Sequence, residues 1–353
     1  MGDLQLTEAP PFKLTIAITT RNRADYIGRT LDSIIPQLTT ETELLVLDGA
    51  STDGTPQVMA EYARRYPPLH YIRLTTNDGP DRDFDRSVMH SRGEYCWLMT
   101  DDDLLLDGAV ATVLAALARR PSLVVVNAEV RNADLSKVIQ RRRLRGSEDR
   151  MYSSADLDGL FADTAAYLSF IGSVVISRAV WAGSDREPYF GSWFIHIGVV
   201  FQRPLPDGAL VLAKPLVSIR YGNAKWRSQQ FELWLFRWPE FIWSFPLVSE
   251  QAKAAVVSRH PWRSVIRLML YRAKGAYTRE EYRRWLKPRV RSLGERISAA
   301  GVLLVPPMLA NVLALLACFA ARDRSGLRIL DLRSSPHYYR SRLRALRGAA
   351  AQR

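Results

Sequence analysis

Short apolar runs alternate with helix-like segments through the first 130 residues, and this pattern restricts the fold more than any other feature. The runs KLTIAIT (13–19), ELLVLD (43–48), LHYIRL (69–74), EYCWLMT (94–100) and SLVVVNAEV (122–130) predict buried strands. Helices are expected over 26–36, 55–65 and 107–118. Strands that alternate with helices form parallel sheets, so we predict an α/β fold with a doubly wound, mostly parallel sheet.

Polar residues follow three of these strands at the point where each strand ends. Thr20-Arg21-Asn22 follows the first strand, Asp48-Gly49 the second, and the triplet DDD (101–103) the fourth. Ligands of open parallel sheets bind beyond the carboxyl ends of the strands. We therefore expect a binding site at this edge.

The glycines exclude two common nucleotide sites. No glycines are spaced as GxGxxG, and GxxxxGK is absent. Asp81, Asp83 and Asp85 have the spacing that begins a calcium loop, but Arg86 and Arg92 stand where that loop needs Gly and Glu. Dinucleotide, P-loop and calcium-loop functions are therefore not supported.

The aspartate triplet predicts a site for a hard cation. Asp101 and Asp103 are two residues apart at a strand end, so their side chains are expected on one side while Asp102 points away. Two carboxylates supply half of a magnesium or manganese site, and water and a diphosphate suit the rest. One triplet does not provide the two separated carboxyl groups of a glycosidase. Acidic residues that begin a helix are alternatively plain capping groups.

In this setting the chain resembles the nucleotide-sugar glycosyltransferases of the GT-A fold, family 2, over roughly residues 13–225. Four blocks match in order: ITTRNRADYIGRTLDSI, ELLVLDGASTDGT, NDGPDRDFDRSV and GEYCWLMTDDDLLL. GSVVISRAVW and YFGSWFIHIGVVF resemble the abequosyltransferase-like branch, which builds bacterial surface glycans. The resemblance implies an NDP-sugar donor and a Mn²⁺ or Mg²⁺ ion held by Asp101 and Asp103 against the donor diphosphate.

The resemblance also implies which residues meet the nucleotide sugar. They are Thr20, Arg21, Asn22, Asp48, Ser51, Asp53, Asp81, Arg82, Asp83, Asp101, Asp102, Arg220 and Asn223. Thr20 and Asn22 would border the nucleotide, and Asp48 would accept a hydrogen bond from its base. Asp81 and Asp83 would lie under the nucleotide or the ribose.

The remaining residues of that set have supporting roles. Ser51 and Asp53 would shape the loop after the second strand. Arg21 and Arg82, together with Arg23, could add positive charge, although surface solvation is an alternative for at least one of them. In similar enzymes a segment like SIRYGNAKW (218–226) closes over the donor, which brings in Arg220 and Asn223; a plain charge at a strand edge is the alternative for Arg220.

The chain departs from the family where many members carry an acidic pair whose aspartate is the catalytic base. That position reads WFIH (193–196), without a carboxylate. His196 is the candidate base, because histidine titrates near neutral pH, or alternatively a metal ligand or a hydrogen-bond partner of the acceptor. A structural histidine on a buried helix is the other alternative. Asp185 and Glu187 are the reserve candidates.

The positive charge is confined to the C-terminal quarter. Residues 259–296 hold 12 Lys and Arg against 3 Glu, and 322–353 hold 9 Arg against 2 Asp, whereas the whole chain has a net charge of +13. A basic segment of this kind is either solvated or meets an anionic partner. No aromatic-basic signature or metal-bound finger accompanies the charge, so nucleic acid is not expected.

The apolar segment 297–321 favours attachment to an anionic membrane surface. Its 25 uncharged residues could just span a bilayer, but Pro306-Pro307 interrupts them and both flanks are basic. Upstream, Trp262, Val265, Ile266, Met269 and Leu270 have the spacing of an amphipathic helix. In-plane or re-entrant attachment is expected, with packing inside a helical subdomain and a true span as alternatives.

Several tryptophans follow the predicted donor segment. Trp226, Trp234, Trp238 and Trp243 fall in a helical region, where such residues are mostly core residues, and stacking on an acceptor sugar is an alternative for one of them. The two cysteines, Cys96 and Cys318, form no disulfide framework and fit a reducing compartment.

These features lead to one hypothesis with two alternatives. We expect an N-terminal extension (1–12), a glycosyltransferase domain (13–228) with a nucleotide half (13–130) and an acceptor half (131–228), and a basic helical membrane-associating region (229–353). The enzyme would transfer a sugar, with inversion, to a lipid-linked saccharide at the cytoplasmic face of the inner membrane, as a peripheral or monotopic protein. A non-catalytic nucleotide-sugar-binding scaffold and a sugar nucleotidyltransferase are the alternatives. The sequence does not indicate an oligomeric state.

Overall fold

The computed structural model describes residues 11–223, 229–321 and 326–339. The chain divides into two compact units. The first takes Met1–Arg131, Arg141–Arg220 and Phe245–Ala252, and the second takes Asn132–Gln140, Tyr221–Ser244 and Lys253–Arg353. Most of the expected N-terminal extension and Trp226 lie outside the described residues. The domain boundaries drawn from the sequence stay a prediction.

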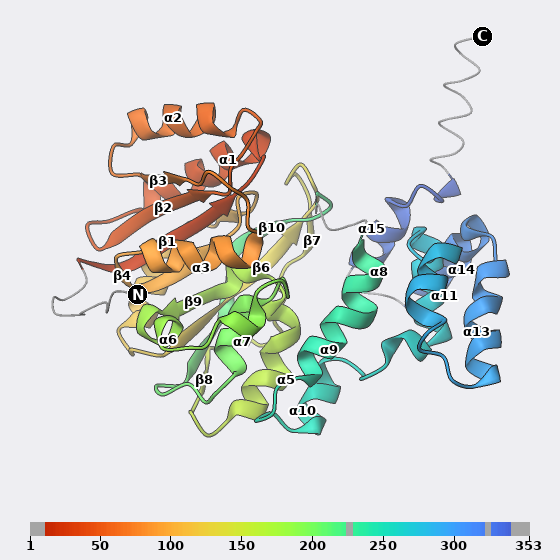
Figure 1. The fold of residues 1–353 in the computed structure, drawn as a ribbon. Helices are drawn as coiled ribbons and strands as arrows, with labels where there is room; N and C mark the ends of the chain where they lie inside the picture. The colour runs from red at the N-terminus through yellow and green to blue at the C-terminus, as the bar shows by residue number, and fades with distance from the viewer. Residues whose placement is uncertain (1–10, 224–228, 322–325, 340–353) are drawn as a thin grey trace, which may run out of the picture. The chain divides into compact units, whose positions relative to one another are not determined.

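The first unit is built on one twisted sheet (Figure 1) with the strand order β3-β2-β1-β4-β9-β6-β10-β5, and β8 pairs with β10 outside this order. β1 is parallel to β2 and β4, β2 to β3, and β6 to β10. The strands are β1 (Phe12–Thr20), β2 (Thr42–Asp48), β3 (His70–Arg73), β4 (Gly93–Met99), β5 (Leu104–Leu105), β6 (Leu123–Arg131), β8 (Arg150–Tyr152), β9 (Val174–Ser177) and β10 (Ala209–Arg220). The five predicted strands are confirmed.

Continuous apolar runs form the central strands because both faces of the sheet are covered. All seven side chains of β2 are buried, which is typical of a strand between two layers of helices. The predicted helices are confirmed as α1 (Ala24–Ile34), α2 (Thr55–Arg65) and α4 (Ala109–Leu117). In α1 the buried positions include Ile27, Leu31 and Ile34, at the predicted spacing.

Helix α3 (Pro80–His90) was not expected from the sequence. This helix begins directly after Gly79, whose φ of 92° lies in the region that glycine favours, and Pro80 occupies its first turn. Its buried face contains Asp81 and Asp83 as well as Phe84. Carboxylates on the buried face hide the hydrophobic periodicity that identifies an amphipathic helix.

One central strand of the sheet is antiparallel to its neighbours: β9 lies between β4 and β6 and is antiparallel to both. The remaining elements of this unit are η1 (Ile35–Gln37), α5 (Leu157–Leu168), η2 (Ile171–Ser173), α6 (Arg178–Ala182), η3 (Glu187–Tyr189) and α7 (Ile195–Phe201). The sheet is therefore mixed but mostly parallel, and the carboxyl ends of β1, β2 and β4 lie at one edge.

The second unit consists mainly of helices, and α10 (Glu250–Val256) straddles the division between the units. Its elements are β7 (Val138–Gln140), α8 (Gln230–Glu232), η5 (Leu233–Arg237), α9 (Trp238–Trp243), η6 (Pro261–Arg263), α11 (Val265–Lys274), α12 (Arg279–Glu281), η7 (Tyr282–Leu286), α13 (Leu293–Leu304), α14 (Pro307–Ala320) and α15 (Leu327–Arg333). Phe231 stacks on Tyr277 with ring centroids 5.1 Å apart, inside a buried cluster that also contains Leu268.

The expected amphipathic stripe on α11 is only partly buried. Trp262 packs into the core of the unit, whereas Val265 and Ile266 are 44% and 76% exposed. Leu268 and Ala273 form the buried face instead. The helix therefore packs on a face that differs from the predicted one.

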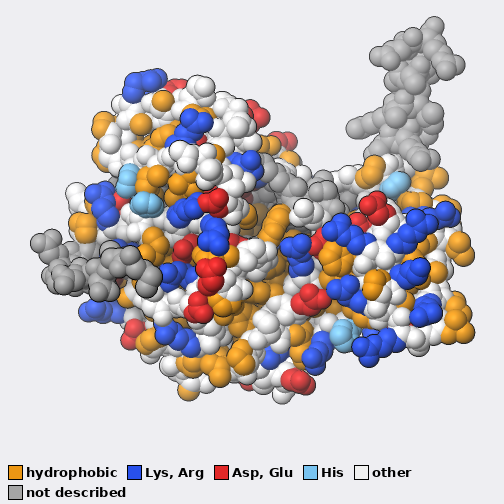
Figure 2. Space-filling model, in the orientation of Figure 1, with side chains coloured by type: hydrophobic (Ala, Val, Ile, Leu, Met, Phe, Trp, Pro, Cys, Tyr) orange, Lys and Arg blue, Asp and Glu red, His pale blue; other side chains and the backbone are white. Residues whose placement is uncertain are grey.

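Among the described helices, none is both long and apolar enough to cross a bilayer by itself. α13 and α14 meet that condition only as a pair, bent by 101° at the break before Pro307. The expected interruption at Pro306-Pro307 is thus confirmed. In the space-filling view, Lys and Arg side chains gather over the helical unit, and apolar side chains lie along the edge that α13 forms (Figure 2).

Candidate functional site

Asp48, the last residue of β2, is completely buried, and both of its carboxylate oxygens accept hydrogen bonds. The backbone N–H of Ser51 donates to Oδ1 at 2.8 Å, and the hydroxyl of Tyr71 donates to Oδ2 at 2.8 Å. Burial and the neighbouring Asp48 carboxylate raise the pKa of Tyr71, so the phenol keeps its proton and remains a donor. Asp48 thus fixes the loop after β2, and its hydrogen bond to a nucleotide base stays a prediction.

Hydrogen bonds join the loop after β1 to the loop after β2. The Asn22 N–H donates to Ser51 Oγ at 2.9 Å, and Asn22 Oδ1 accepts from the Thr52 N–H at 2.7 Å. Asp53 Oδ2 accepts from the Ala24 N–H at 3.2 Å. Asn22 has a φ of 54°, a conformation that asparagine tolerates better than most residues. The structure therefore brings the predicted residues Asn22, Ser51 and Asp53 together.

Thr20 and Arg21 lie at the same edge. Thr20 is buried, and its hydroxyl has no hydrogen-bond partner within the described part of the chain. Arg21 is exposed, and its backbone N–H points at Asp101 Oδ2 from 3.4 Å. A buried hydroxyl without a protein partner is uncommon, so Thr20 marks this edge as a place where a ligand could supply the partner.

Asp83 lies against the end of β2. A Cβ atom at Gly49 would stand 2.4 Å from Asp83 Oδ2, so this approach requires glycine. Burial raises the pKa of Asp83 to about 6, with the Arg86 guanidinium opposing the shift and Asp78 adding to it. The structure thus brings Asp83 to the predicted site.

Asp81 holds the loop that leads into α7. Its carboxylate accepts hydrogen bonds from the backbone N–H groups of Trp193 at 2.8 Å and Ile195 at 3.2 Å. Trp193 has a φ of 74° and Gly191 a φ of 83°, so this carboxylate stabilises a turn of unusual backbone conformation. Burial raises the pKa of Asp81 although these N–H groups oppose the shift. The contact that the structure gives Asp81 is with this loop.

The acidic triplet is arranged differently from the expectation. Arg23 lies across Asp101 and Asp102, with its Nε 3.3 Å from Asp101 Oδ1 and its terminal nitrogen 3.3 Å from Asp102 Oδ2. Asp102 therefore does not point away from Asp101. The reason is that β4 ends at Met99, so the alternation of a strand no longer applies at the triplet.

Asp103 is buried and engaged through both oxygens. The Arg220 N–H donates to Oδ1 at 2.7 Å, and the Thr100 hydroxyl donates to Oδ2. Arg220 Nε donates in turn to the carbonyl of Asp102 at 2.9 Å. Burial, followed by the negative charges of Asp102 and Asp101, raises the pKa of Asp103 well above its usual range. Arg220, at the end of β10, is therefore tied to the triplet rather than being a free charge at a strand edge.

The triplet offers a donor set that fits a hard cation in part. Within the described ranges, no three His, Cys, Asp or Glu side chains are grouped so that they could hold a metal ion by themselves. Carboxylate oxygens are the ligands that Mg²⁺ and Mn²⁺ prefer, and these ions often take their other ligands from water and phosphate. Burial, and after it the charges of Asp102 and Asp101, raise the pKa of Asp103, and a bound cation would oppose this shift. Asp101 and Asp103 thus fit as the protein's contribution to such a site.

An aromatic ring joins two of the cationic side chains, and the sequence analysis did not single it out. The guanidinium carbons of Arg23 and Arg220 lie 5.4 Å and 5.1 Å from the ring centroid of Tyr26 on α1. Burial lowers the pKa of Arg220, and the nearby Arg29 lowers it further. Tyr26 and Arg29 carry no sequence signal for this role, because only the packing of α1 against the sheet edge brings them to the triplet.

His196 is completely buried on α7. Its Nε2 lies 2.6 Å from the carbonyl oxygen of Leu168, and its Nδ1 has no hydrogen-bond partner among the described residues. Burial lowers the pKa of His196 to about 4, so the ring is neutral at pH 7 and Nε2–H donates to the carbonyl. This environment favours the structural alternative for His196, and its role as base or metal ligand stays a prediction.

The reserve candidates lie on an exposed segment. The Asp185 carboxylate accepts a hydrogen bond from the Glu187 N–H at 3.2 Å, and both side chains face solvent. Arg82 lies 3.7 Å from Glu187 Oε1 and 4.2 Å above the ring of Phe190. The structure thus places Arg82 against this segment. Asn223 belongs to the second unit.

The fold and this strand edge define a class of protein. The curled, mostly parallel sheet with an acidic triplet at the end of β4 is that of a GT-A glycosyltransferase. Residues 15–170 match the family model described as glycosyl transferase family 2. Over residues 15–170 the chain thus matches a family 2 glycosyltransferase domain, and the comparisons support a glycosyltransferase.

Two curated relatives are an abequosyltransferase and a succinoglycan biosynthesis protein. The chain is 27% identical over 223 residues to abequosyltransferase RfbV of Salmonella typhimurium, covering 60% of this chain and 67% of that protein. It is 27% identical over 183 residues to the succinoglycan biosynthesis protein ExoO of Rhizobium meliloti, covering 52% of this chain and 48% of that protein. The predicted resemblance to the abequosyltransferase-like branch is confirmed.

A solved structure shares the fold over most of the chain. S. aureus TarS 1–349 superposes with a TM-score of 0.56 at 20% sequence identity, and the match covers 91% of each chain. The same protein solved in complex with UDP superposes with a TM-score of 0.52 at 17% identity. At this identity the likeness shows the fold alone.

Proposed function

We propose that the chain transfers a hexose or deoxyhexose, with inversion, from an NDP-sugar to a hydroxyl group of a polyprenyl-diphosphate-linked saccharide. The product would be a bacterial surface glycan such as a lipopolysaccharide. The observation that carries the proposal is the triplet at the end of β4, where Asp101 and Asp103 stand beside Arg23 and Arg220. The names of RfbV, an abequosyltransferase, and ExoO, a succinoglycan biosynthesis protein, support sugar transfer in the synthesis of a glycan.

The residues of the strand edge would bind the nucleotide and position its diphosphate. The Thr20 hydroxyl has no hydrogen-bond partner among the residues that the structure describes, and Asp48, Asn22 and Ser51 fix the shape of the two loops. Arg23 holds two carboxylates at present, and a donor diphosphate would compete with them for its guanidinium. Arg23 would therefore supply positive charge next to the donor diphosphate.

A divalent cation would complete this charge arrangement. GT-A enzymes commonly use one, and Asp101 and Asp103 would hold Mn²⁺ or Mg²⁺ here. When bound, such an ion offsets the negative charge of the departing NDP without a proton transfer. The hydrogen bonds from Thr100 and Arg220 would hold Asp103 in one orientation, since both oxygens have donors.

The acceptor hydroxyl must lose a proton as the glycosidic bond forms. Among the candidates, Asp185 faces solvent as a carboxylate, whereas His196 is buried and bonded to a backbone carbonyl. We therefore favour Asp185 as the group that accepts the proton, and substituting each residue in turn distinguishes the two candidates.

Donor binding can be tested by thermal unfolding of the full chain with UDP-, GDP-, CDP- and dTDP-sugars, in Mn²⁺ and in chelator. A ligand that binds only the folded state at 100 times its Kd stabilises that state by about 2.7 kcal/mol. We expect one nucleotide to stabilise the wild type in Mn²⁺, and Asp101→Asn to remove this effect. Asp107→Asn, an exposed carboxylate near the triplet, is the matched control.

Absence of stabilisation by every nucleotide sugar would contradict the proposal. Stabilisation without transfer to any acceptor and without donor hydrolysis would instead favour a nucleotide-sugar-binding scaffold. That alternative is kept because the predicted base position carries a buried histidine.

The second unit supports attachment to an anionic bilayer, at the cytoplasmic face of the inner membrane, as a peripheral or monotopic protein. Leu304 on α13 and Leu309, Leu316 and Phe319 on α14 are 49–80% exposed. Apolar side chains in such number on a basic unit are typical of helices that lie in the interface of an anionic membrane.

Attachment of this kind predicts that the chain binds anionic vesicles more strongly than neutral ones. The full chain should sediment with vesicles that contain phosphatidylglycerol, and more weakly with phosphatidylcholine alone, because attraction to anionic lipid falls without the surface charge. Leu316→Glu with Phe319→Glu should lower the bound fraction at least about five-fold. The matched control places glutamate at two exposed positions of the first unit, Met89 and Met151. Equal loss in both variants would argue against attachment through α14.

A further inference from the structure

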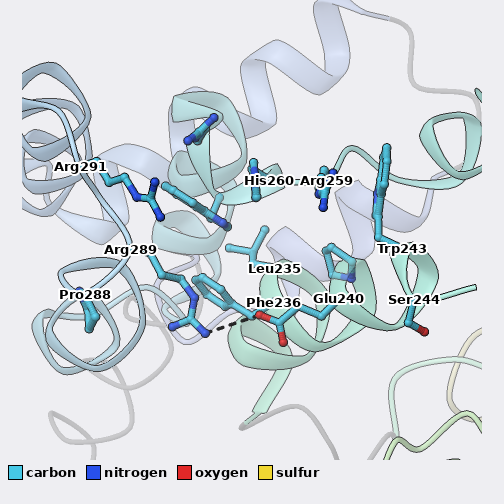
Figure 3. Close-up of a pocket in the computed structure, with 13 residues that line it drawn as sticks. Leu235, Phe236, Glu240, Trp243, Ser244, Arg259, His260, Pro288, Arg289 and Arg291 are labelled. Atoms are coloured by element: carbon cyan, nitrogen blue, oxygen red, sulfur yellow. Dashed lines mark ion pairs between the residues drawn. The ribbon is translucent and has the colours of Figure 1, made fainter. Parts of the chain in front are cut away.

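The second unit contains a cavity of about 540 Å³, within the range of ligand-binding pockets. Cationic side chains from η6 and the segments beside it, and from the turn after η7, meet the aromatic surface of η5 and α9 (Figure 3). The residues that line it include Trp243, Arg259, His260, Arg263, Arg289 and Arg291.

The pocket has more cations than carboxylates to balance them. Arg289 faces Glu240 at 3.5 Å, the ion pair drawn in Figure 3. Arg263 Nε lies 3.0 Å from Glu295 Oε1. Considering only the residues that the structure describes, no carboxylate lies within ion-pair distance of the Arg259 or Arg291 guanidinium. Neither guanidinium is therefore held in an ion pair, although the backbone N–H and the charge of Arg291 help to lower the pKa of Glu295.

Aromatic rings hold several of these arginines in place. The guanidinium carbon of Arg259 lies 5.3 Å from the ring centroid of Trp243, and that of Arg289 lies 4.9 Å from the ring centroid of Phe236. Trp243 is fixed in turn, because its Nε1–H donates to the carbonyl of Val257 at 3.0 Å. Cations that are held in this way lose less conformational entropy when they bind an anion.

The pKa of His260 reflects the charges that surround it in the pocket. Partial burial and then the positive charges of Arg263 and Arg259 lower the pKa of His260, and Arg291 acts in the same direction. Glu295 opposes this shift but does not reverse it. The summed potential is thus positive, which is the condition that attracts an anion.

We infer that this pocket binds the phosphate groups of the polyprenyl-diphosphate-linked acceptor. Arginine binds phosphate oxygens through two parallel N–H groups, which makes it the preferred residue for this anion. A diphosphate has enough charge to pair with both Arg259 and Arg291, and 540 Å³ leaves room for part of the adjoining sugar or prenyl chain. The identity of the acceptor rests on the proposed function, whereas the affinity for phosphate rests on the pocket alone.

The first test measures binding of inorganic pyrophosphate to the full chain by calorimetry at low salt. We expect Arg259→Gln with Arg291→Gln to raise the Kd at least about 10-fold. Arg283→Gln with Arg296→Gln removes the same charge from exposed positions outside the pocket and should change the Kd less than about two-fold. No binding to the wild type, or equal weakening in both variants, would overturn the inference.

The second test identifies the source of the phosphate. A short prenyl diphosphate should displace pyrophosphate from the wild type, and an oligonucleotide of equal charge should not. If phosphatidylglycerol vesicles displace pyrophosphate and the prenyl diphosphate does not, the assignment to the acceptor is overturned.

Stabilisation by the NDP-sugar is measured on the same variants. We expect Arg259→Gln with Arg291→Gln to leave it unchanged. A wild type that binds pyrophosphate without any response to nucleotide sugars would refute the proposed function and leave the phosphate site standing.

Discussion

Asp101→Asn is expected to lower kcat for sugar transfer by about 100- to 1,000-fold, the range found when one charge-stabilising group is removed from an active site. The substitution keeps the shape of the side chain and removes the charge that faces Arg23 and, when bound, the divalent cation. Transfer is measured with the donor that thermal unfolding identifies. The folded state should survive, because asparagine has nearly the same size as aspartate and keeps one acceptor oxygen for its neighbours.

Asp103→Asn should cost as much activity but also some stability. Its two oxygens accept from the Thr100 hydroxyl and the Arg220 N–H, and an amide can serve only one of these donors with its oxygen. Comparing the activity and stability of the two variants separates the effect of removing a carboxylate charge from the effect of removing a hydrogen bond. Asp107→Asn is the control, and activity within three-fold of wild type in Asp101→Asn would contradict the role of the triplet.

The strand edge itself was predictable because its signal is local. Apolar runs predict the strands, and the polar residues that follow a parallel strand must lie at its carboxyl end. Asp48 and Asp101 were placed in this way, and the structure puts both at the predicted edge. The resemblance to glycosyltransferase sequence blocks then indicated sugar transfer, which the spacing of the residues alone did not.

What each side chain contacts was not predictable, because it depends on neighbours far apart in the chain. The hydrogen bonds of Asp81 to backbone groups more than 110 residues later were not predicted, and its place beside a nucleotide stays a prediction. Tyr26 contacts Arg220 only because α1 packs against the strand edge where β10 ends. The orientation of Asp102 was mistaken because the alternation of β4 was extended beyond its last residue, Met99.

His196 presents the clearest conflict between motif and environment. The motif places it where related enzymes carry their base, yet its ring is buried, neutral and bonded to the Leu168 carbonyl. A base must reach the acceptor hydroxyl, directly or through one water. A structural histidine, which links α7 to the end of α5 and takes no part in proton transfer, explains the same observations.

We expect His196→Ala to lower the free energy of unfolding by about 2–4 kcal/mol, because it leaves a cavity and an unpaired carbonyl. Urea unfolding measures this loss. His196→Gln can donate an N–H to Leu168 and should recover part of the stability. If the role of His196 is structural, kcat of the folded His196→Gln variant stays within about ten-fold of wild type. Asp185→Asn, by contrast, should lose activity without losing stability, because its side chain is exposed.

The pH dependence gives an independent readout. The pKa of His196 is about 4 in the folded chain and about 6.5 in the unfolded chain, so the unfolded state binds more protons between these values. Stability from the neutral ring is complete above pH 6.5 and falls as the pH drops toward 4, by about 3 kcal/mol in total. His196→Gln should flatten this part of the profile. A profile unchanged by the substitution, combined with loss of turnover in the folded variant, would return His196 to the role of base.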